Sequence, residues 1–180
     1  EEEGFEVTYL PVAHSTGIID LEVLKQAMRP DTLMVSAIHV NNEIGVMQQL
    51  IDGEICRANG TFFHTDSAQG FGKVPINVDE MNIDLMSISG HKIYAPKGIG
   101  AVYIRKKQEL ASATDERRWI RESFRSGTLA PHLCVGLGEA ARLAKLEMQE
   151  DLTWIKYLND KLYTGLNKNL SHLVLNGDKL

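Results

Sequence analysis

Cysteine is scarce in this chain of 180 residues, since only Cys56 and Cys134 occur. Neither lies in a Cys-x-x-Cys spacing or in a cluster of Cys and His residues of the kind that binds zinc. Two isolated thiols also exclude the disulfide framework of small secreted proteins. We therefore predict two buried cysteines in a protein of a reducing compartment, and no metal site.

The chain also lacks an excess of one charge and a long apolar run. It has 19 basic and 24 acidic residues, giving a net charge of −5, and the two signs are interspersed. A nucleic-acid-binding protein would be expected to carry a basic patch. No run approaches the ~20 apolar residues of a membrane-spanning helix. We expect small molecules or proteins as partners, with no nucleic acid and no membrane.

Both ends of the sequence are typical of the interior of a longer protein. The chain begins with Glu-Glu-Glu-Gly-Phe, with no initiator Met and no signal-peptide pattern, and it stops at Asn-Gly-Asp-Lys-Leu. We expect a fragment, so a targeting segment of the whole protein would have been lost.

What is present is an alternation of apolar runs and helical patterns. Residues 20–28 predict a helix capped by Asp20, and residues 51–59 predict a second helix that stops at Asn59-Gly60. Four apolar runs predict buried strands, namely Leu33–Val40, Thr61–Thr65, Leu85–Ser89 and Gly100–Arg105. This order predicts an α/β fold with a mostly parallel sheet flanked by helices, in which ligands bind at the carboxyl ends of the strands.

The last part of the chain carries one long helical pattern. It runs from about Leu133 to Leu170, and the residues that trace one face are Leu152, Ile155, Leu158 or Asn159, Leu162 and Leu166. We predict a main domain over residues 1–150. Residues 151–180 would form a bridging helix and the start of a second domain, with its first strand at Leu173–Leu175.

The segment Ser87-Ile-Ser-Gly-His-Lys92 ends an apolar strand on a glycine and then a lysine. A lysine that forms an imine must be a neutral amine for part of the time, which requires desolvation or a nearby positive charge. The apolar strand before Lys92 could supply the desolvation. The alternative is an ordinary surface lysine at a strand end, and this segment alone leaves both open.

Asp66 closes the apolar segment Phe62-Phe-His-Thr-Asp66. A carboxylate in such a place is costly unless it is paired, and a protonated pyridine nitrogen, such as that of pyridoxal phosphate (PLP), is a suitable partner. The alternative is an N-cap, because Ser67, Ala68 and Gln69 follow.

Three further segments hold polar side chains that could contact a ligand. Asn42 follows the first strand and could bind a phenolic oxygen, although Asn41-Asn42 is also typical of a turn. Ser89 and His91 could hold a phosphate, or could have structural roles. Arg125-Ser-Gly-Thr128 could donate to an anion, or could form a solvated turn.

In their order along the chain, four segments resemble the cysteine desulfurases, which are class V aminotransferase-like PLP enzymes that feed iron–sulfur cluster assembly. The segments are Asn41-Asn-Glu-Ile-Gly45, His64-Thr-Asp-Ser-Ala-Gln69, Ser89-Gly-His-Lys-Ile-Tyr-Ala-Pro-Lys-Gly98 and Arg125-Ser-Gly-Thr128. The resemblance covers nearly the whole chain. It implies the fold of PLP fold-type I, with residues 1–150 as the central part of the PLP-binding large domain and 151–180 as the start of the small domain.

The resemblance also implies a reaction and its principal residues. Lys92 would be the catalytic residue, which binds PLP covalently and moves the proton at the substrate α-carbon, while Asp66 would pair with the pyridine nitrogen. The family converts L-cysteine to L-alanine and leaves the sulfur as a persulfide on an enzyme cysteine. Iron–sulfur scaffold proteins would be the sulfur acceptors.

Further cofactor contacts follow from the same resemblance. Gln69 and Asn42 would contact the phenolic oxygen of PLP, and Ser89 and His91 would hold its phosphate. Thr128 would reach the phosphate of the cofactor in a partner subunit, which implies a homodimer.

The chain departs from the family in three places. Neither Cys56 nor Cys134 matches the persulfide-forming cysteine, which lies on a later loop outside this chain. The stretch Gln48–Ile55 is one residue shorter than expected, so we expect its helix to be turned by roughly 100°. The stretch Ala111–Phe124 replaces a glycine-rich run that ends in Gln-Glu-Arg-Gly. We therefore predict a cysteine desulfurase as the parent protein and an inactive isolated chain.

Two alternatives and one compartment complete the sequence-based expectations. Selenocysteine lyases and cysteine sulfinate desulfinases share the features at Asp66 and Lys92, and a degenerate, non-catalytic form could act as a binding module. The segment His64-Thr-Asp66 and the run Asn82–Ser89 resemble the mitochondrial branch of the family. We expect the mitochondrial matrix, with the cytoplasm as the alternative.

Overall fold

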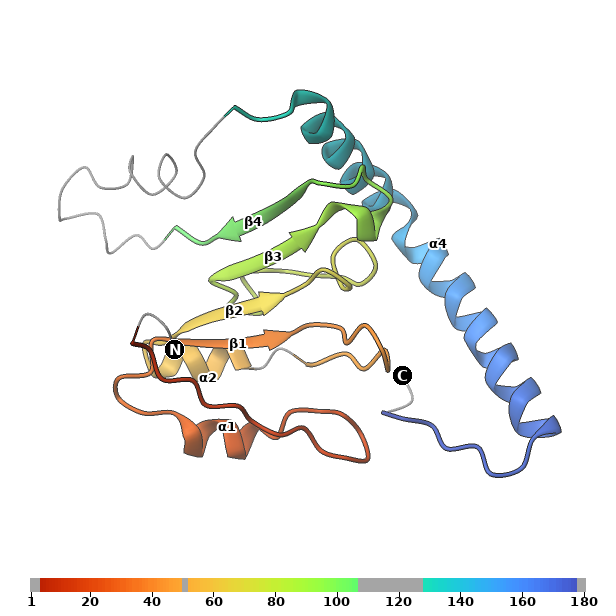
Figure 1. The fold of residues 1–180 in the computed structure, drawn as a ribbon, viewed down its shortest axis with the longest axis horizontal. Helices are drawn as coiled ribbons and strands as arrows, with labels where there is room; N and C mark the ends of the chain where they lie inside the picture. Colours follow the sequence, from red (N-terminus) through yellow and green to blue (C-terminus); the bar gives the residue numbers. More distant parts are fainter. Residues whose placement is uncertain (1–3, 50–51, 107–127, 178–180) are drawn as a thin grey trace.

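The computed structural model describes residues 4–49, 52–106 and 128–177. The elements, in chain order, are α1 (Leu21–Ala27), β1 (Met34–Ile38), α2 (Asp52–Ala58), β2 (Phe62–Asp66), β3 (Leu85–Ser89), the short 3-10 helix η1 (Gly90–Ile93), β4 (Gly100–Ile104) and α4 (Pro131–Asn169) (Figure 1). This order confirms the prediction of an α/β fold, and all four predicted strands are present.

The sheet has the strand order β1-β2-β3-β4, and its first three strands are parallel. The pairing places Ile38 beside Asp66 and Asp66 beside Ser87. Strand β4 runs antiparallel to β3. The prediction of a mostly parallel sheet is therefore confirmed, and β1, β2 and β3 all end at the same edge.

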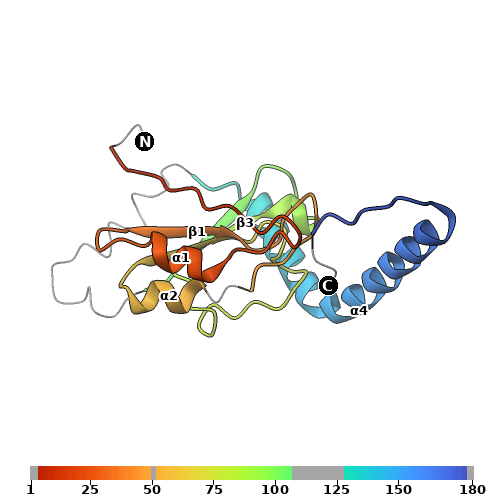
Figure 2. The ribbon, with the colours of Figure 1, turned by 90° about the horizontal axis from the view of Figure 1, so that it is seen from below.

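One face of the sheet carries the core. Ala37, Phe63 and Met86, which share this face because the pairing aligns alternate residues, pack with Cys56 of α2 and with Ile83. Phe63, Cys56 and Ile83 are fully buried. Helix α2 packs against β1 and β2, on one side of the sheet in Figure 2. Burying these side chains is the principal source of stability for the strands.

The opposite face is more exposed than the sequence suggested. Met34 is 50%, Val102 61% and Ile104 42% exposed. The prediction of a buried strand at Gly100–Arg105 is therefore right about the strand and wrong about its burial. The physical reason is its position, because β4 lies at the end of the strand order and pairs with β3 alone.

The caps and lengths of the helices agree with the sequence pattern. Asp20 caps α1 as predicted, since its Oδ1 accepts a hydrogen bond of 2.9 Å from the Glu22 amide. The long helix predicted from about Leu133 to Leu170 is confirmed as α4. Its first turns pack against the segment that follows η1, where an added side-chain carbon at Gly136 would lie 2.8 Å from the Pro96 ring.

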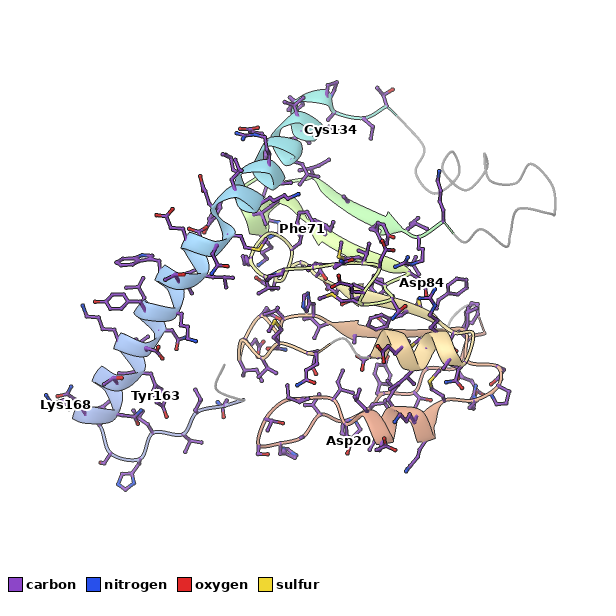
Figure 3. All side chains as sticks on the ribbon, turned by 180° about the vertical axis from the view of Figure 1, so that it is seen from behind. Asp20, Phe71, Asp84, Cys134, Tyr163 and Lys168 are labelled. Carbon is purple, nitrogen blue, oxygen red and sulfur yellow. The ribbon has the colours of Figure 1, made fainter. Side chains whose placement is uncertain are left out.

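The remainder of α4 extends away from the sheet, and Figure 3 shows Tyr163 and Lys168 along this part. The predicted apolar face is exposed there, with Ile155 at 58% and Leu162 at 64%. The prediction of a strand at Leu173–Leu175 is wrong, because this segment has irregular structure and pairs with no strand among the described residues. Within residues 4–49, 52–106 and 128–177, no helix is both long and apolar enough to cross a membrane.

Candidate cofactor site

A pocket of ≈ 180 Å³ opens at the edge of the sheet where the three parallel strands end. Its lining residues come from the last residue of β1, the loop after β1, the end of β2 with the following turn, and η1 after β3; they are Ile38, Asn42, Asp66, Ala68, Gln69 and Lys92. Four predicted site residues therefore line one pocket, although they are distant in sequence. This is the position at which open α/β sheets bind ligands.

Asp66 is both a capping residue and a wall of the pocket. Its Oδ1 accepts a hydrogen bond of 2.9 Å from the Ala68 amide, which begins the turn after β2. The capping alternative is thus present in the structure, at a turn rather than at a helix. A carboxylate has two oxygens and about four acceptor sites, so this hydrogen bond leaves capacity for a cationic ligand group.

Lys92 is partly buried and sits on a closed loop between β3 and β4. The Gly90 amide donates to the Ile99 carbonyl at 3.0 Å, and the Ala95 amide donates to the Gly90 carbonyl at 3.1 Å. Residue 90 must be glycine, because a side-chain carbon there would lie 2.8 Å from the Ile99 carbonyl oxygen. The backbone beneath Lys92 is therefore fixed at both ends of the loop.

The two adjacent asparagines have different environments. Asn41 forms the turn, since its Oδ1 accepts hydrogen bonds from the Glu43 amide at 2.9 Å and the Ile44 amide at 3.0 Å. Asn42 lines the pocket. Asn41 thus forms the predicted turn, and Asn42 is left on the wall of the pocket.

Gln69 has a partner that the sequence analysis missed. Lys73 Nζ donates a hydrogen bond of 3.1 Å to Gln69 Oε1. The pKa of Lys73 is lowered by burial and, to a smaller extent, by the positive charge of Lys92. The sequence could have predicted this contact from the spacing of four residues between Gln69 and Lys73. This spacing brings two side chains together where the chain turns as in a helix.

Ser89, His91 and Thr128 lie outside the lining of this pocket. Ser89 Oγ and His91 Nδ1 are 3.0 Å apart and form a hydrogen-bonded pair directly before Lys92. Thr128 is exposed and precedes α4. The rest of the segment Arg125–Thr128, and the altered stretch Ala111–Phe124, lie outside the described residues.

Two histidines, one directly after β1 and one in β2, were also not predicted. His64 bridges three strands, with Nδ1 2.7 Å from Ser36 Oγ and Nε2 2.9 Å from Ser87 Oγ. Burial lowers the pKa of His64, against the opposing effect of the Asp66 carboxylate. His39 is 2% exposed, with Nδ1 3.4 Å from Ser67 Oγ, and burial lowers its pKa as well.

The cysteines differ in accessibility, and neither borders the pocket. Cys56 is fully buried, and burial raises its pKa to about 12, with smaller contributions from Asp52 and Asp84. Cys134 is partly exposed near the start of α4 (Figure 3), so the prediction of two buried cysteines is confirmed for Cys56 and wrong for Cys134. Across residues 4–49, 52–106 and 128–177, no group of three or more His, Cys, Asp or Glu side chains is placed to hold a metal ion.

The chain is similar in sequence to curated proteins that are named cysteine desulfurases. The chain is 50% identical to a protein named probable cysteine desulfurase, mitochondrial, from Dictyostelium discoideum, over 99% of the chain and 40% of that protein. It is 54% identical to the cysteine desulfurase IscS of Rickettsia bellii, over 99% of the chain and 44% of that protein. The chain therefore spans less than half the length of these curated relatives.

A solved structure supports the fold independently. The crystal structure of DndA from Streptomyces lividans superposes with a TM-score of 0.83 at 38% identity, covering 99% of this chain and 51% of that one. Residues 1–179 match the family described as aminotransferase class-V, whose members depend on PLP. The chain belongs to the class-V aminotransferase family.

Proposed function

We propose that this chain is the cofactor-binding part of a PLP-dependent cysteine desulfurase. The observation that carries the proposal is the convergence of Asn42, Asp66, Gln69 and Lys92 on one pocket at the carboxyl ends of the parallel strands. The names of the relatives at 50% and 54% identity support the same activity.

The donor set of the pocket fits PLP. The cofactor has a basic ring nitrogen, an aldehyde and a phenolic oxygen, which require a carboxylate, an amine and hydrogen-bond donors. Asp66 supplies the carboxylate, Lys92 the amine, and Asn42 and Gln69 the amide donors. When bound, PLP would supply an electron sink for the substrate α-carbon.

The chain's own residues divide the remaining work. The Asp66 carboxylate would keep a proton on the ring nitrogen by pairing with it. Lys92 Nζ would hold the cofactor covalently, and after exchange with the substrate amine it would take and return the proton at the α-carbon. The hydrogen-bonded loop between Gly90 and Ile99 would restrain the backbone that carries this amine.

The phosphate would be held next to this pocket by residues at the end of β3, in η1 and before α4. Ser89 and His91 form a hydrogen-bonded pair just before Lys92, with a hydroxyl and an imidazole available to an anion. Thr128, exposed before α4, would contact the phosphate of the cofactor in a second subunit. This arrangement requires a homodimer.

In the overall reaction L-cysteine becomes L-alanine, and its sulfur is transferred to an enzyme cysteine as a persulfide. Cys56 is unsuited to this role because it is fully buried, with a pKa raised to about 12. Cys134 does not border the pocket, and in the family that the chain resembles the persulfide-forming cysteine lies on a later loop, so we place the sulfur-accepting cysteine outside residues 1–180. Iron–sulfur scaffold proteins would then receive the sulfur, and the mitochondrial relative favours a mitochondrial location.

A covalent mapping experiment tests the site. The full-length protein that includes residues 1–180 would be mixed with PLP, reduced with borohydride and digested for mass mapping. We expect a PLP adduct at Lys92, its loss in Lys92→Ala, and its retention in Lys97→Ala, which alters an exposed lysine of the same loop. Adducts scattered over exposed lysines in all three proteins would contradict the proposed site.

A substrate comparison tests the reaction. The PLP-loaded full-length protein should form alanine from L-cysteine, and Lys92→Ala should not. Efficient turnover of selenocysteine or cysteine sulfinate, with little turnover of cysteine, would instead assign the protein to one of the two related activities. Normal PLP attachment without turnover of any of the three would favour a binding module.

A further inference from the structure

We infer that Lys73 is a positioning residue that fixes the orientation of the Gln69 side-chain amide at the pocket. The inference rests on the proposed function, because it concerns how the pocket presents a hydrogen-bond donor to PLP. Lys73 itself is absent from the pocket lining, while Gln69 is part of it. Lys73 would therefore act through Gln69.

The orientation follows from the chemistry of the two side chains. An ammonium group only donates hydrogen bonds, so the amide atom that faces Lys73 Nζ at 3.1 Å must be the carbonyl oxygen Oε1 of Gln69. The other amide atom, Nε2, can then donate elsewhere. Without a partner of this kind, the two ends of a glutamine amide are nearly equivalent, and either one can face a ligand.

The backbone that carries Lys73 is held in place. The Phe71 amide donates to the Ser67 carbonyl at 2.7 Å, and the Lys73 amide donates to the Gly70 carbonyl at 3.0 Å. Gly70 is pressed against the buried ring of His39, where an added side-chain carbon would lie 2.5 Å from Nδ1. These contacts fix the turn, and with it the distance between Lys73 and Gln69.

Packing on the other side of the turn limits its movement further. Gly72 has a φ of +74°, and a side-chain carbon there would lie 2.9 Å from Ala144 of α4 and 3.0 Å from Ile93 of η1. The turn is thus held between His39 on one side and the α4–η1 contact on the other. Ile93 directly follows Lys92, so the same contact connects Lys73 to the loop of the reactive lysine.

The ligand group that this arrangement fits is an oxygen acceptor with partial negative charge, such as the phenolic oxygen of PLP. Gln69 would present N–H groups to it, and the Lys73 ammonium would add positive charge nearby. Lys73 lies close enough to Lys92 for the two charges to repel each other. The pair of Lys73 and Gln69 therefore favours an anionic oxygen over a neutral hydroxyl.

The test uses the full-length protein that includes residues 1–180, loaded with PLP. Two quantities that do not depend on turnover would be measured. The first is the midpoint, which is the pH at which the change in the visible absorption of bound PLP is half complete, and the second is the PLP dissociation constant. In Lys73→Gln the midpoint should rise by about 0.5 pH unit or more. The replacement weakens the hydrogen bond that Gln69 donates to the phenolic oxygen and removes the positive charge near that oxygen. The dissociation constant should rise several-fold.

Two matched variants separate positioning from a general effect of charge or folding. Lys73→Arg keeps a cation that only donates, so its midpoint should stay near that of the wild type. Lys25→Gln removes an equal charge at an exposed site on α1, where the side chain is 51% exposed, and should also match the wild type. A rise in the midpoint of Lys25→Gln equal to that of Lys73→Gln would overturn the inference.

A double-mutant cycle tests whether Lys73 acts through Gln69. Lys73→Gln should have a smaller effect on the midpoint in a Gln69→Ala protein than in the wild type, whereas additive effects would overturn the inference. If Lys73→Gln fails to fold, Gln69→Glu provides the test with Lys73 in place. Its carboxylate can accept from Lys73 but has no N–H for the ring oxygen, so the midpoint should rise, and an unchanged midpoint would overturn the inference.

The outcomes also distinguish this inference from the proposed function. A wild-type protein that forms no PLP adduct at Lys92 would overturn both. A wild-type protein with a normal adduct at Lys92, together with a Lys73→Gln protein of unchanged midpoint and affinity, would overturn only the role of Lys73.

Discussion

His64 Nδ1 lies 2.7 Å from Ser36 Oγ, across the paired strands β1 and β2. The same ring reaches Ser87 on β3 through Nε2. Alternate residues of a strand share one face, so His64 lies on the face of Asp66. One imidazole therefore links all three parallel strands, two residues before the pocket residue Asp66.

The buried His39 and the partly buried His64 predict how stability depends on pH. Burial lowers the pKa of His64 and of His39 below the ordinary value of 6.5 in the folded chain. The unfolded chain then takes up protons first, so the stability contribution is present above about pH 6.5 and is lost as the pH falls through the lowered values. We expect the urea midpoint to decrease from pH 7 to pH 5.

The contribution of His64 can be isolated by replacement. In His64→Gln the urea midpoint should fall less between pH 7 and pH 5 than in the wild type. The glutamine amide can still form hydrogen bonds with the serines, and it does not titrate in this range. The exposed residue His132, replaced by Gln in the same way, is the control. An unchanged pH dependence in His64→Gln would show that the imidazole does not contribute.

Asp66→Asn is expected to separate the two roles of this residue. The asparagine oxygen can still accept from the Ala68 amide, so the turn should persist and the melting temperature should change little. The charge that would pair with the ring nitrogen is lost, and under the proposed function alanine formation by the PLP-loaded full-length protein should fall on the order of 10²–10³-fold. Retained turnover with a large loss of stability would reverse this assignment.

Gly53 and Gly138 form a matched pair for stability. A side-chain carbon at Gly53 of α2 would collide with the Met81 carbonyl oxygen, whereas one at Gly138 of α4 would meet no atom within 4 Å. Gly53→Ala should therefore cost about 1–3 kcal/mol of unfolding free energy. Gly138→Ala should add about 0.5–1 kcal/mol, because alanine favours a helix. Urea unfolding would measure both, and equal effects would argue against close packing of α2.

The two cysteines should differ strongly in reactivity. With a pKa of about 12, Cys56 would be a thiolate in roughly one molecule of 10⁴ at pH 8, and it is fully buried. Iodoacetamide followed by mass mapping should label Cys134 of the native protein and leave Cys56 unlabelled. Labelling of Cys56 at a comparable rate in the native protein would contradict the packing of α2 on the sheet.

Local patterns predicted the elements well and the environment of the sheet less well. Leu85–Ser89 forms β3 with the predicted limits, and Asp20 caps α1, because both follow from residues adjacent in the chain. The exposure of Val102 depends on the strand order, and the irregular structure of Leu173–Leu175 depends on the lack of a neighbouring strand among the described residues. Periodicity alone contains neither kind of information.

The same distinction applies to the site. Asp66 and Lys92 could be predicted because each follows an apolar run, and the carboxyl ends of parallel strands meet at one edge. Lys73 was missed because its contact with Gln69 depends on a hydrogen-bonded turn after β2 that was not predicted. His64 was missed because its contacts depend on the strand register, which pairs Ser36 with His64 and Ser87 with Asp66 on the same face of the sheet.

The closed loop between Gly90 and Ile99 has a consequence for kinetics. The amine of Lys92 is at the end of a flexible side chain, but the backbone that carries this side chain is restrained, because the loop is tied at both ends. The amine can therefore sample only the small volume that its four methylene groups allow. An aldehyde in the pocket would encounter it at a high effective molarity, and attachment would behave as an intramolecular reaction.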